Sequence, residues 1–150
     1  MDTRTLLLTV VIFAHCLIAG MWWIAGTWMG LSRRASRHWM TAALAYGAAL
    51  SITAMGQTTA TQAHDLTTAA LGTTLLVWGA ISHRRGLSFF LKTPVSRLEQ
   101  TLLISGVSAL NLLLCWPLGA ITAAMAISGL TLNWTLWRTV RQGYQPIVVE

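Results

Sequence analysis

The sequence predicts an all-α protein, a polytopic membrane bundle of about five transmembrane helices. Of its 150 residues, 55% are hydrophobic and only 9% are charged, whereas a soluble domain averages about 25% charged residues. A chain of this length could not bury so much apolar surface in water. The net charge of +6 is carried by breaks between apolar runs, which favours a membrane surface over nucleic acid as the partner.

The apolar residues form five runs within a single domain, and a spanning helix needs roughly 17–25 residues. The first run is too long for a signal peptide and has no basic segment before it, so we expect a retained helix. The fourth and fifth runs meet at Pro117 and Gly119, which favour a turn. The runs cover residues 5–31, 39–55, 66–82, 101–116 and 118–137, and a short cytoplasmic tail follows at 138–150.

The basic residues define the orientation. Nine of the ten Lys and Arg residues fall in the breaks 32–38 and 83–100 or in the tail, and the exception is Arg4. The positive-inside rule therefore predicts an N-out, C-in protein of the bacterial inner membrane. Within the longest inner break, we expect the apolar stretch 86–91 to lie flat at the headgroup boundary.

Basic and Trp side chains near the inner ends of the runs are predicted to anchor the chain in the interface, against anionic lipid. Docking of a soluble protein partner by the Arg clusters is the alternative. The predicted anchors are Arg33, Arg34, Arg37, Trp39, Trp78, Arg84, Arg85, Trp137 and Arg138.

Four residues deep in the apolar runs are candidates for a ligand site: His15, Cys16, Asn111 and Asn133. A histidine in hydrocarbon is costly and suggests function, but a neutral histidine bonded to a neighbouring helix explains it too, and amides often pin helix packing. Copper or haem ligation is a weaker alternative. His15 and Cys16 point about 100° apart on a helix, and no second histidine lies at a matching depth. We therefore predict no cofactor and no metal.

Small residues recur at four-residue spacing, a pattern that lets membrane helices approach closely. The spacing does not separate packing within the chain from a homo-oligomer. The pairs are Gly26 with Gly30, Ala43 with Gly47, Gly47 with Ser51, and Ser105 with Ala109.

Catalysis is not expected. The four acids are Asp2, Asp65, Glu99 and Glu150, and the orientation places Asp65 and Glu99 on opposite faces of the membrane. No paired carboxylates, nucleophile motif or P-loop occurs.

Three stretches resemble the N-terminal membrane module of bacterial GGDEF-type diguanylate cyclases. They are residues 1–8, residues 37–56 with Arg37-His38-Trp39 at the inner end, and residues 76–94 with Trp78-Gly79, then Gly86, Phe89-Phe90 and Pro94. The resemblance implies a sensor that passes a signal through its last helix to the cytoplasm. No GGDEF motif occurs in these 150 residues, and no ligand residue carries over.

The sequence therefore predicts a non-catalytic sensory or regulatory membrane module that relays a signal to a cytoplasmic partner or output domain. The alternative is a structural or assembly subunit of a larger membrane complex. A small transporter is the weaker option, because transport favours broken helices or charges at the midplane.

Overall fold

The computed structural model describes residues 3–56, 62–116 and 118–148, and these residues form a five-helix bundle, as predicted. The helices are α1 (Thr3–Thr27), α2 (Arg33–Gly56), α3 (Gln62–Phe90), α4 (Arg97–Cys115) and α5 (Ile121–Val148).

The helices do not end where the apolar runs end. α2 begins six residues before its run, α3 continues eight residues beyond its run, and α5 continues into the predicted tail. Arg, Ser and His are all compatible with a helix interior, so loss of apolarity does not stop the backbone hydrogen bonding. The stretch 86–91, predicted to lie flat as a separate segment, instead supplies the last helical turn of α3 and its exit.

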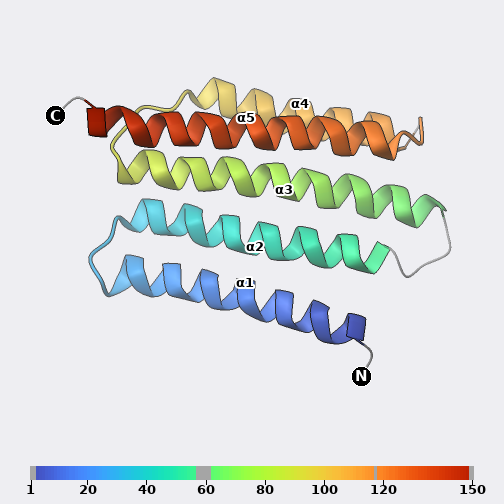
Figure 1. Cartoon of the computed structure of the whole chain (residues 1–150), viewed down its shortest axis with the longest axis horizontal. Coiled ribbons are helices and arrows are strands. Elements are labelled where there is room, and N and C mark those ends of the chain that lie inside the picture. Colours follow the sequence, from blue (N-terminus) through green and yellow to red (C-terminus); the bar gives the residue numbers. More distant parts are fainter. Residues whose placement is uncertain (1–2, 57–61, 117, 149–150) are drawn as a thin grey trace.

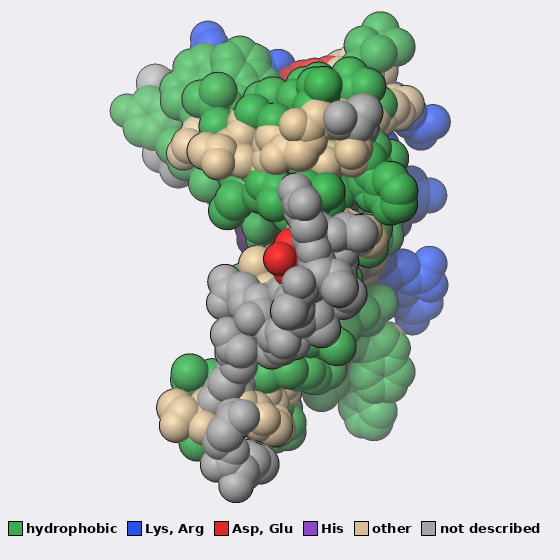
Figure 2. Space-filling view, turned by 90° about the vertical axis from the view of Figure 1, so that its right-hand side faces the viewer, with side chains coloured by type: hydrophobic (Ala, Val, Ile, Leu, Met, Phe, Trp, Pro, Cys, Tyr) green, Lys and Arg blue, Asp and Glu red, His purple; other side chains and the backbone are tan. Residues whose placement is uncertain are grey.

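Consecutive helices are antiparallel, and α1, α2 and α3 lie in one row with α4 and α5 beyond α3 (Figure 1). Among the described helices, α1 packs against α2 alone, while α5 packs against both α3 and α4. Viewed from the end where α2 and α4 finish and α3 and α5 begin, hydrophobic side chains run along the sides of this narrow stack (Figure 2). The bundle is therefore an open row rather than a closed ring around one core.

Glycines of α3 set the contact between α2 and α3. Gly72, Gly79 and Gly86 are spaced seven residues apart and face Thr53, Tyr46 and Trp39, which are spaced seven apart in the opposite direction along α2. A Cβ at position 79 would lie 2.7 Å from Tyr46 Cε1, and one at position 72 would lie 2.5 Å from Thr53 Oγ1. We call this contact the glycine seam. The missing side chains let the two helices approach closely.

Trp39 is the largest side chain in the seam and is only 8% exposed. Its ring lies 4.3 Å from that of Trp22 on α1, and its Nε1–H donates to the carbonyl of His83 on α3 at 3.2 Å. The structure therefore buries Trp39, a predicted interface anchor, among three helices. A side chain held on all sides has little surface left for lipid headgroups.

The α1–α2 contact also depends on small residues. A Cβ at Gly47 would lie 2.8 Å from His15 Cβ, and one at Gly26 would lie 2.6 Å from Ser36 Cβ. Both glycines belong to the small-residue faces identified in the sequence, and they lie at contacts within the chain.

A buried polar cluster joins the remaining helices. Asn111 of α4 is 0% exposed, and its Nδ2 donates to Thr73 Oγ1 of α3 at 3.1 Å and to Ser128 Oγ of α5 at 3.0 Å. Apolar side chains pack beside it, including Val77, Ile81 and Val107. Because each of these polar groups has a partner, the cluster fixes the rotation of three helices without leaving the Asn111 amide unsatisfied.

The α4–α5 connection turns at Gly119, whose φ of 61° is the left-handed conformation that glycine adopts at no steric cost. Pro117, which the sequence analysis expects to break the helix here, lies outside the described residues.

Within the part of the chain that the structure describes, two helices are long and apolar enough to cross a membrane, the segments Thr5–Thr27 and Arg97–Cys115. By length and composition alone, a signal sequence or the core helix of a soluble protein passes the same test. A soluble core helix is mostly buried, however, whereas only 6% and 22% of the apolar windows in these two helices are buried. α2, α3 and α5 are less apolar because Ala, Gly, Ser and Thr fill much of their length, so five spans remain a prediction.

The glycine seam predicts that no side chain larger than hydrogen fits at position 79 without loss of stability. We expect Gly79→Ala to lower the free energy of unfolding by about 1–3 kcal/mol, because the new methyl group overlaps the Tyr46 ring. Gly106→Ala is the matched control, since nothing lies within 4 Å of a Cβ there, and should stabilise α4 by up to about 1 kcal/mol. Thermal unfolding in detergent checks both, and an unchanged midpoint for Gly79→Ala would contradict the seam.

Candidate functional site

Most of the cationic side chains gather at one end of the stack, which we call the basic end. The α1–α2 and α3–α4 connections and the C-terminus of α5 lie there (Figure 1). Nine Lys and Arg residues belong to this end: Arg33, Arg34, Arg37, Arg84, Arg85, Lys92, Arg97, Arg138 and Arg141. Glu99 is the acidic residue that the described chain places among them, so the basic end carries a large excess of positive charge.

Glu99 connects three helices at this end. Its Oε1 accepts from Arg84 Nη1 of α3 at 3.0 Å, and its Oε2 accepts from Arg138 Nη2 of α5 at 3.2 Å. Arg84 is only 2% exposed, whereas Glu99 and Arg138 are 24% and 36% exposed. Arg84, which the sequence analysis predicts as an interface anchor, is buried here with its guanidinium paired to Glu99. We call these three residues the Glu99 junction.

The N-terminus of α4 positions Glu99. Ser96 is the N-cap residue, and its Oγ accepts from the backbone N–H of Glu99 at 3.2 Å. Ser-x-x-Glu is the signature of a capping box, in which the glutamate side chain normally turns back to the cap. Here the carboxylate bonds to Arg84 and Arg138 instead, so the cap fixes the backbone while the charge stays available for the junction.

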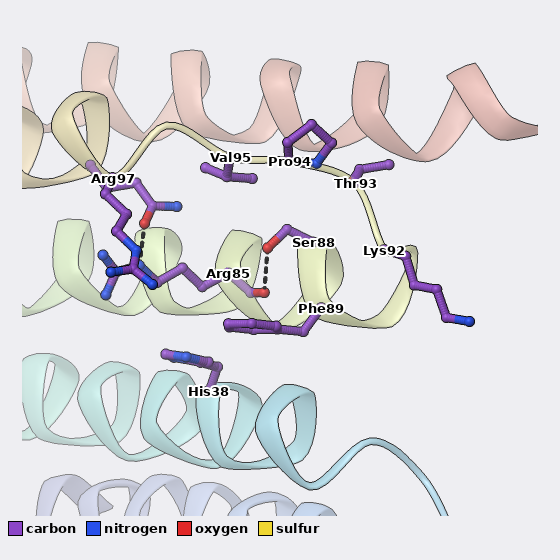
Figure 3. Close-up of a pocket in the computed structure, with 10 residues that line it drawn as sticks. His38, Arg85, Ser88, Phe89, Lys92, Thr93, Pro94, Val95 and Arg97 are labelled. Atoms are coloured by element: carbon purple, nitrogen blue, oxygen red, sulfur yellow. Dashed lines mark hydrogen bonds between the residues drawn. The ribbon is translucent and has the colours of Figure 1, made fainter.

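Beside the junction lies a cavity of about 660 Å³, which we call the basic cavity (Figure 3). Its wall comes from α2, the end of α3, the α3–α4 connection and the start of α4. The lining residues are His38, Arg85, Ser88, Phe89, Lys92, Thr93, Pro94, Val95, Arg97 and Gln100. The lining contains three cations and no carboxylate.

One wall of the cavity is a stacked aromatic pair. The rings of His38 on α2 and Phe89 on α3 lie 5.4 Å apart and nearly parallel, with an interplanar angle of 8°. His38 precedes the second apolar run. Partial burial lowers its pKa, and the positive charge of Arg85 lowers that pKa further. His38 is therefore a neutral imidazole near pH 7 and adds a polar but uncharged group to the wall.

Two polar atoms in the cavity wall lack hydrogen-bond partners. Arg85 Nε donates to Gln100 Oε1, which orients the Gln100 amide. Gln100 is only 2% exposed, yet its Nε2 has no hydrogen-bond partner, and the buried Oγ1 of Thr93 has none either. A buried donor without a partner costs about 1–3 kcal/mol. The cavity therefore holds unused hydrogen-bonding capacity beside its cations.

The exit from α3 adds backbone strain. Lys92 has a φ of 55°, and the N–H of Thr93 donates to the carbonyl of Ser88 at 3.0 Å. This is the long hydrogen bond of a Schellman motif, in which the left-handed position is usually glycine. A lysine at this position introduces strain that glycine would avoid, and it adds a cation to the cavity lining.

The four deep candidates do not form one site. The Nδ1–H of His15 donates to the carbonyl of Val11 on its own helix at 2.8 Å, and Cys16 is exposed. Asn111 belongs to the buried cluster between α3, α4 and α5, while Asn133 is exposed and bonds to its own helix. His15 and Asn111 lie on helices that do not touch. Among the described side chains, no group of three or more His, Cys, Asp or Glu residues could hold a metal ion.

Several predicted anchors are exposed. They include Trp78, which is 44% exposed, and Trp137, which is 50% exposed, together with Arg33, Arg34 and Arg37 at the start of α2. Arg85 is only partly exposed and lines the cavity.

Sequence reasoning missed Glu99, Gln100 and Thr93. A signal for Glu99 was present, because it is a lone acid in a segment with four cations. Nothing in the sequence identifies Gln100 or Thr93, since their importance depends on which atoms remain unpaired after folding.

Comparison with protein-family models, curated proteins and solved structures found no match to this chain.

The Glu99 junction predicts a specific mutational effect. Glu99→Gln leaves Arg84 buried beside a neutral amide, so we expect a loss of on the order of 2–4 kcal/mol of stability, below the cost for a wholly buried pair. Hydrogen exchange should accelerate in the last turns of α5, which lose the Arg138 contact, and should change little in α1. Arg34→Gln alters an exposed charge at the same end and should do neither; equal effects of the two variants would contradict the junction.

Proposed function

We propose that this chain is a non-catalytic, five-pass protein of the bacterial inner membrane that acts as a sensory or regulatory module. The membrane assignment is supported by the apolar side chains that face outward. Leu7, Phe13 and Met21 of α1 are 60%, 63% and 68% exposed, and Leu102 and Leu113 of α4 are 62% and 56% exposed. Helices with this much uncovered apolar surface require lipid or a partner around them.

The proposed orientation puts the basic end in the cytoplasm. Nine cations at one end of five antiparallel helices fit the positive-inside rule. Trp28 and Trp137, which are 80% and 50% exposed, lie toward this end and suit a lipid interface.

The relay is carried by one observation, the Glu99 junction. It couples the cytoplasmic ends of α3 and α4 to α5, through the contacts of Arg84 and Arg138 with one carboxylate. α5 has 28 residues, which is about 42 Å of helix at 1.5 Å per residue. The hydrocarbon core is about 30 Å thick, so the last turns of α5 lie beyond it, at the level of the inner headgroups. A shift of α3 against α4 would therefore move a projecting helix that a partner or output domain can read.

The structural-subunit alternative has its own support. α1 packs on α2 along one side, and only 6% of its apolar window is buried. A second protein or a second copy of this chain would find an uncovered apolar helix there. Native mass spectrometry from nanodiscs separates the two functions: an obligate complex of fixed stoichiometry favours the subunit, whereas a stable monomer favours the relay.

The orientation has a direct test. A C-terminal green fluorescent protein should fluoresce and a C-terminal alkaline phosphatase should be inactive, because the C-terminus is cytoplasmic. Alkaline phosphatase placed in the 57–61 connection should be active. The reverse pattern would refute the proposed topology, and release of the protein from membranes without detergent would refute the membrane assignment itself.

A further inference from the structure

The basic cavity has the composition of an anion site. Its lining supplies Arg85, Lys92 and Arg97 and contains no carboxylate. The nearest acid in sequence, Glu99, already has both oxygens in ion pairs with Arg84 and Arg138. The three cationic side chains of the lining therefore have no counter-charge within it, and an anion that enters meets no repelling group.

Two buried hydrogen-bond donors without partners also indicate an anion site. Gln100 is 98% buried, and the amide that lines the cavity has a free Nε2. The hydroxyl of Thr93 is the second buried polar group without a partner. Such groups normally have a protein or ligand partner. Oxygens of a bound anion would accept from both, while Arg85 remains fixed by its bond to Gln100 Oε1.

The shape and the apolar lining of the basic cavity indicate which kind of anion fits it. In Figure 3 the side chains of Arg85 and Arg97 extend toward the same end of the cavity, whereas Lys92 points away from it. Guanidinium groups bind phosphate oxygens through paired hydrogen bonds. A volume of about 660 Å³ exceeds what a phosphate alone needs, and Phe89, Pro94 and Val95 offer apolar surface to carbon atoms next to it.

We propose that the basic cavity binds a phosphate group, presented by the headgroup of an anionic phospholipid in the inner leaflet or by free phosphate. The proposal rests on the proposed function, because that orientation places the cavity at the level of the inner headgroups, where basic pockets between helices recognise such lipids. A ligand there contacts α2, α3 and α4 together. Gln100 is adjacent to Glu99 in the sequence. A phosphate group bound in the basic cavity therefore acts on the Glu99 junction, which holds α5.

The test uses the purified full chain in neutral detergent. Native mass spectrometry measures retention of phosphatidylglycerol against phosphatidylcholine, and thermal shift measures the effect of inorganic phosphate. We expect the wild-type chain to prefer phosphatidylglycerol, because the choline cation is repelled by the cavity. Arg97→Gln should weaken this binding about tenfold, as expected for one charge-assisted hydrogen bond. Arg141→Gln removes an equal charge from an exposed residue that neither lines the cavity nor belongs to the predicted lipid anchors, and it should change binding less than about twofold.

A second variant keeps the test independent of folding. Thr93→Val removes the unpartnered hydroxyl with little change of volume, so it should weaken phosphatidylglycerol binding severalfold without lowering the unfolding midpoint of the lipid-free protein. Stabilisation by inorganic phosphate that Arg97→Gln abolishes would also support the proposal and assign the source to soluble phosphate. Stabilisation by phosphatidylglycerol alone assigns it to lipid.

Two outcomes would overturn the proposal: equal losses in Arg141→Gln and Arg97→Gln, or no preference for phosphatidylglycerol together with no response to phosphate. Either result in a chain with the predicted topology would leave the proposed function intact. A reversed topology would instead refute the proposed function, whatever the cavity binds.

Discussion

The glycine seam between α2 and α3 determines where everything else lies. Gly72, Gly79 and Gly86 admit three large or branched side chains of α2 at seven-residue intervals, and this fixes both the distance and the register of the two helices. The same register places His38 over Phe89 and brings Arg85 beside it. The wall of the basic cavity that His38, Arg85 and Phe89 form is therefore a product of the packing of α2 against α3.

The cations of the basic end differ in whether they are paired with an acid. One acid serves two arginines in the Glu99 junction, and the cations of the cavity have no acid of their own. The junction neutralises the most buried cation, Arg84, which could not remain charged in isolation. The exposed cations remain free for partners. The end is thus divided between charges that hold the helices together and charges that are available for binding.

The sequence predicted the five helices because their apolar runs are long, and it predicted one basic end because the breaks alternate in charge. The glycine seam was also visible in principle, at seven-residue spacing in both helices, but a search at four-residue spacing passes over it. The cavity was not predictable. It requires α3 to continue to Phe90 and to end at a left-handed Lys92, where residue preferences favour glycine. Asn111 and Asn133 look alike in sequence because each lies within an apolar run, and only packing separates the buried amide from the exposed one.

The order of the helices in the stack has a consequence for synthesis. Among the described helices, α1 contacts α2, α2 contacts α1 and α3, and the one contact between helices that are not consecutive joins α3 to α5. Each pair can therefore form as soon as its second helix leaves the ribosome, with little waiting for distant segments. The last step is the arrival of α5, which completes both the Asn111 cluster and the Glu99 junction. A chain that stalls before α5 would lack the Ser128 partner of the Asn111 amide and the Arg138 partner of Glu99.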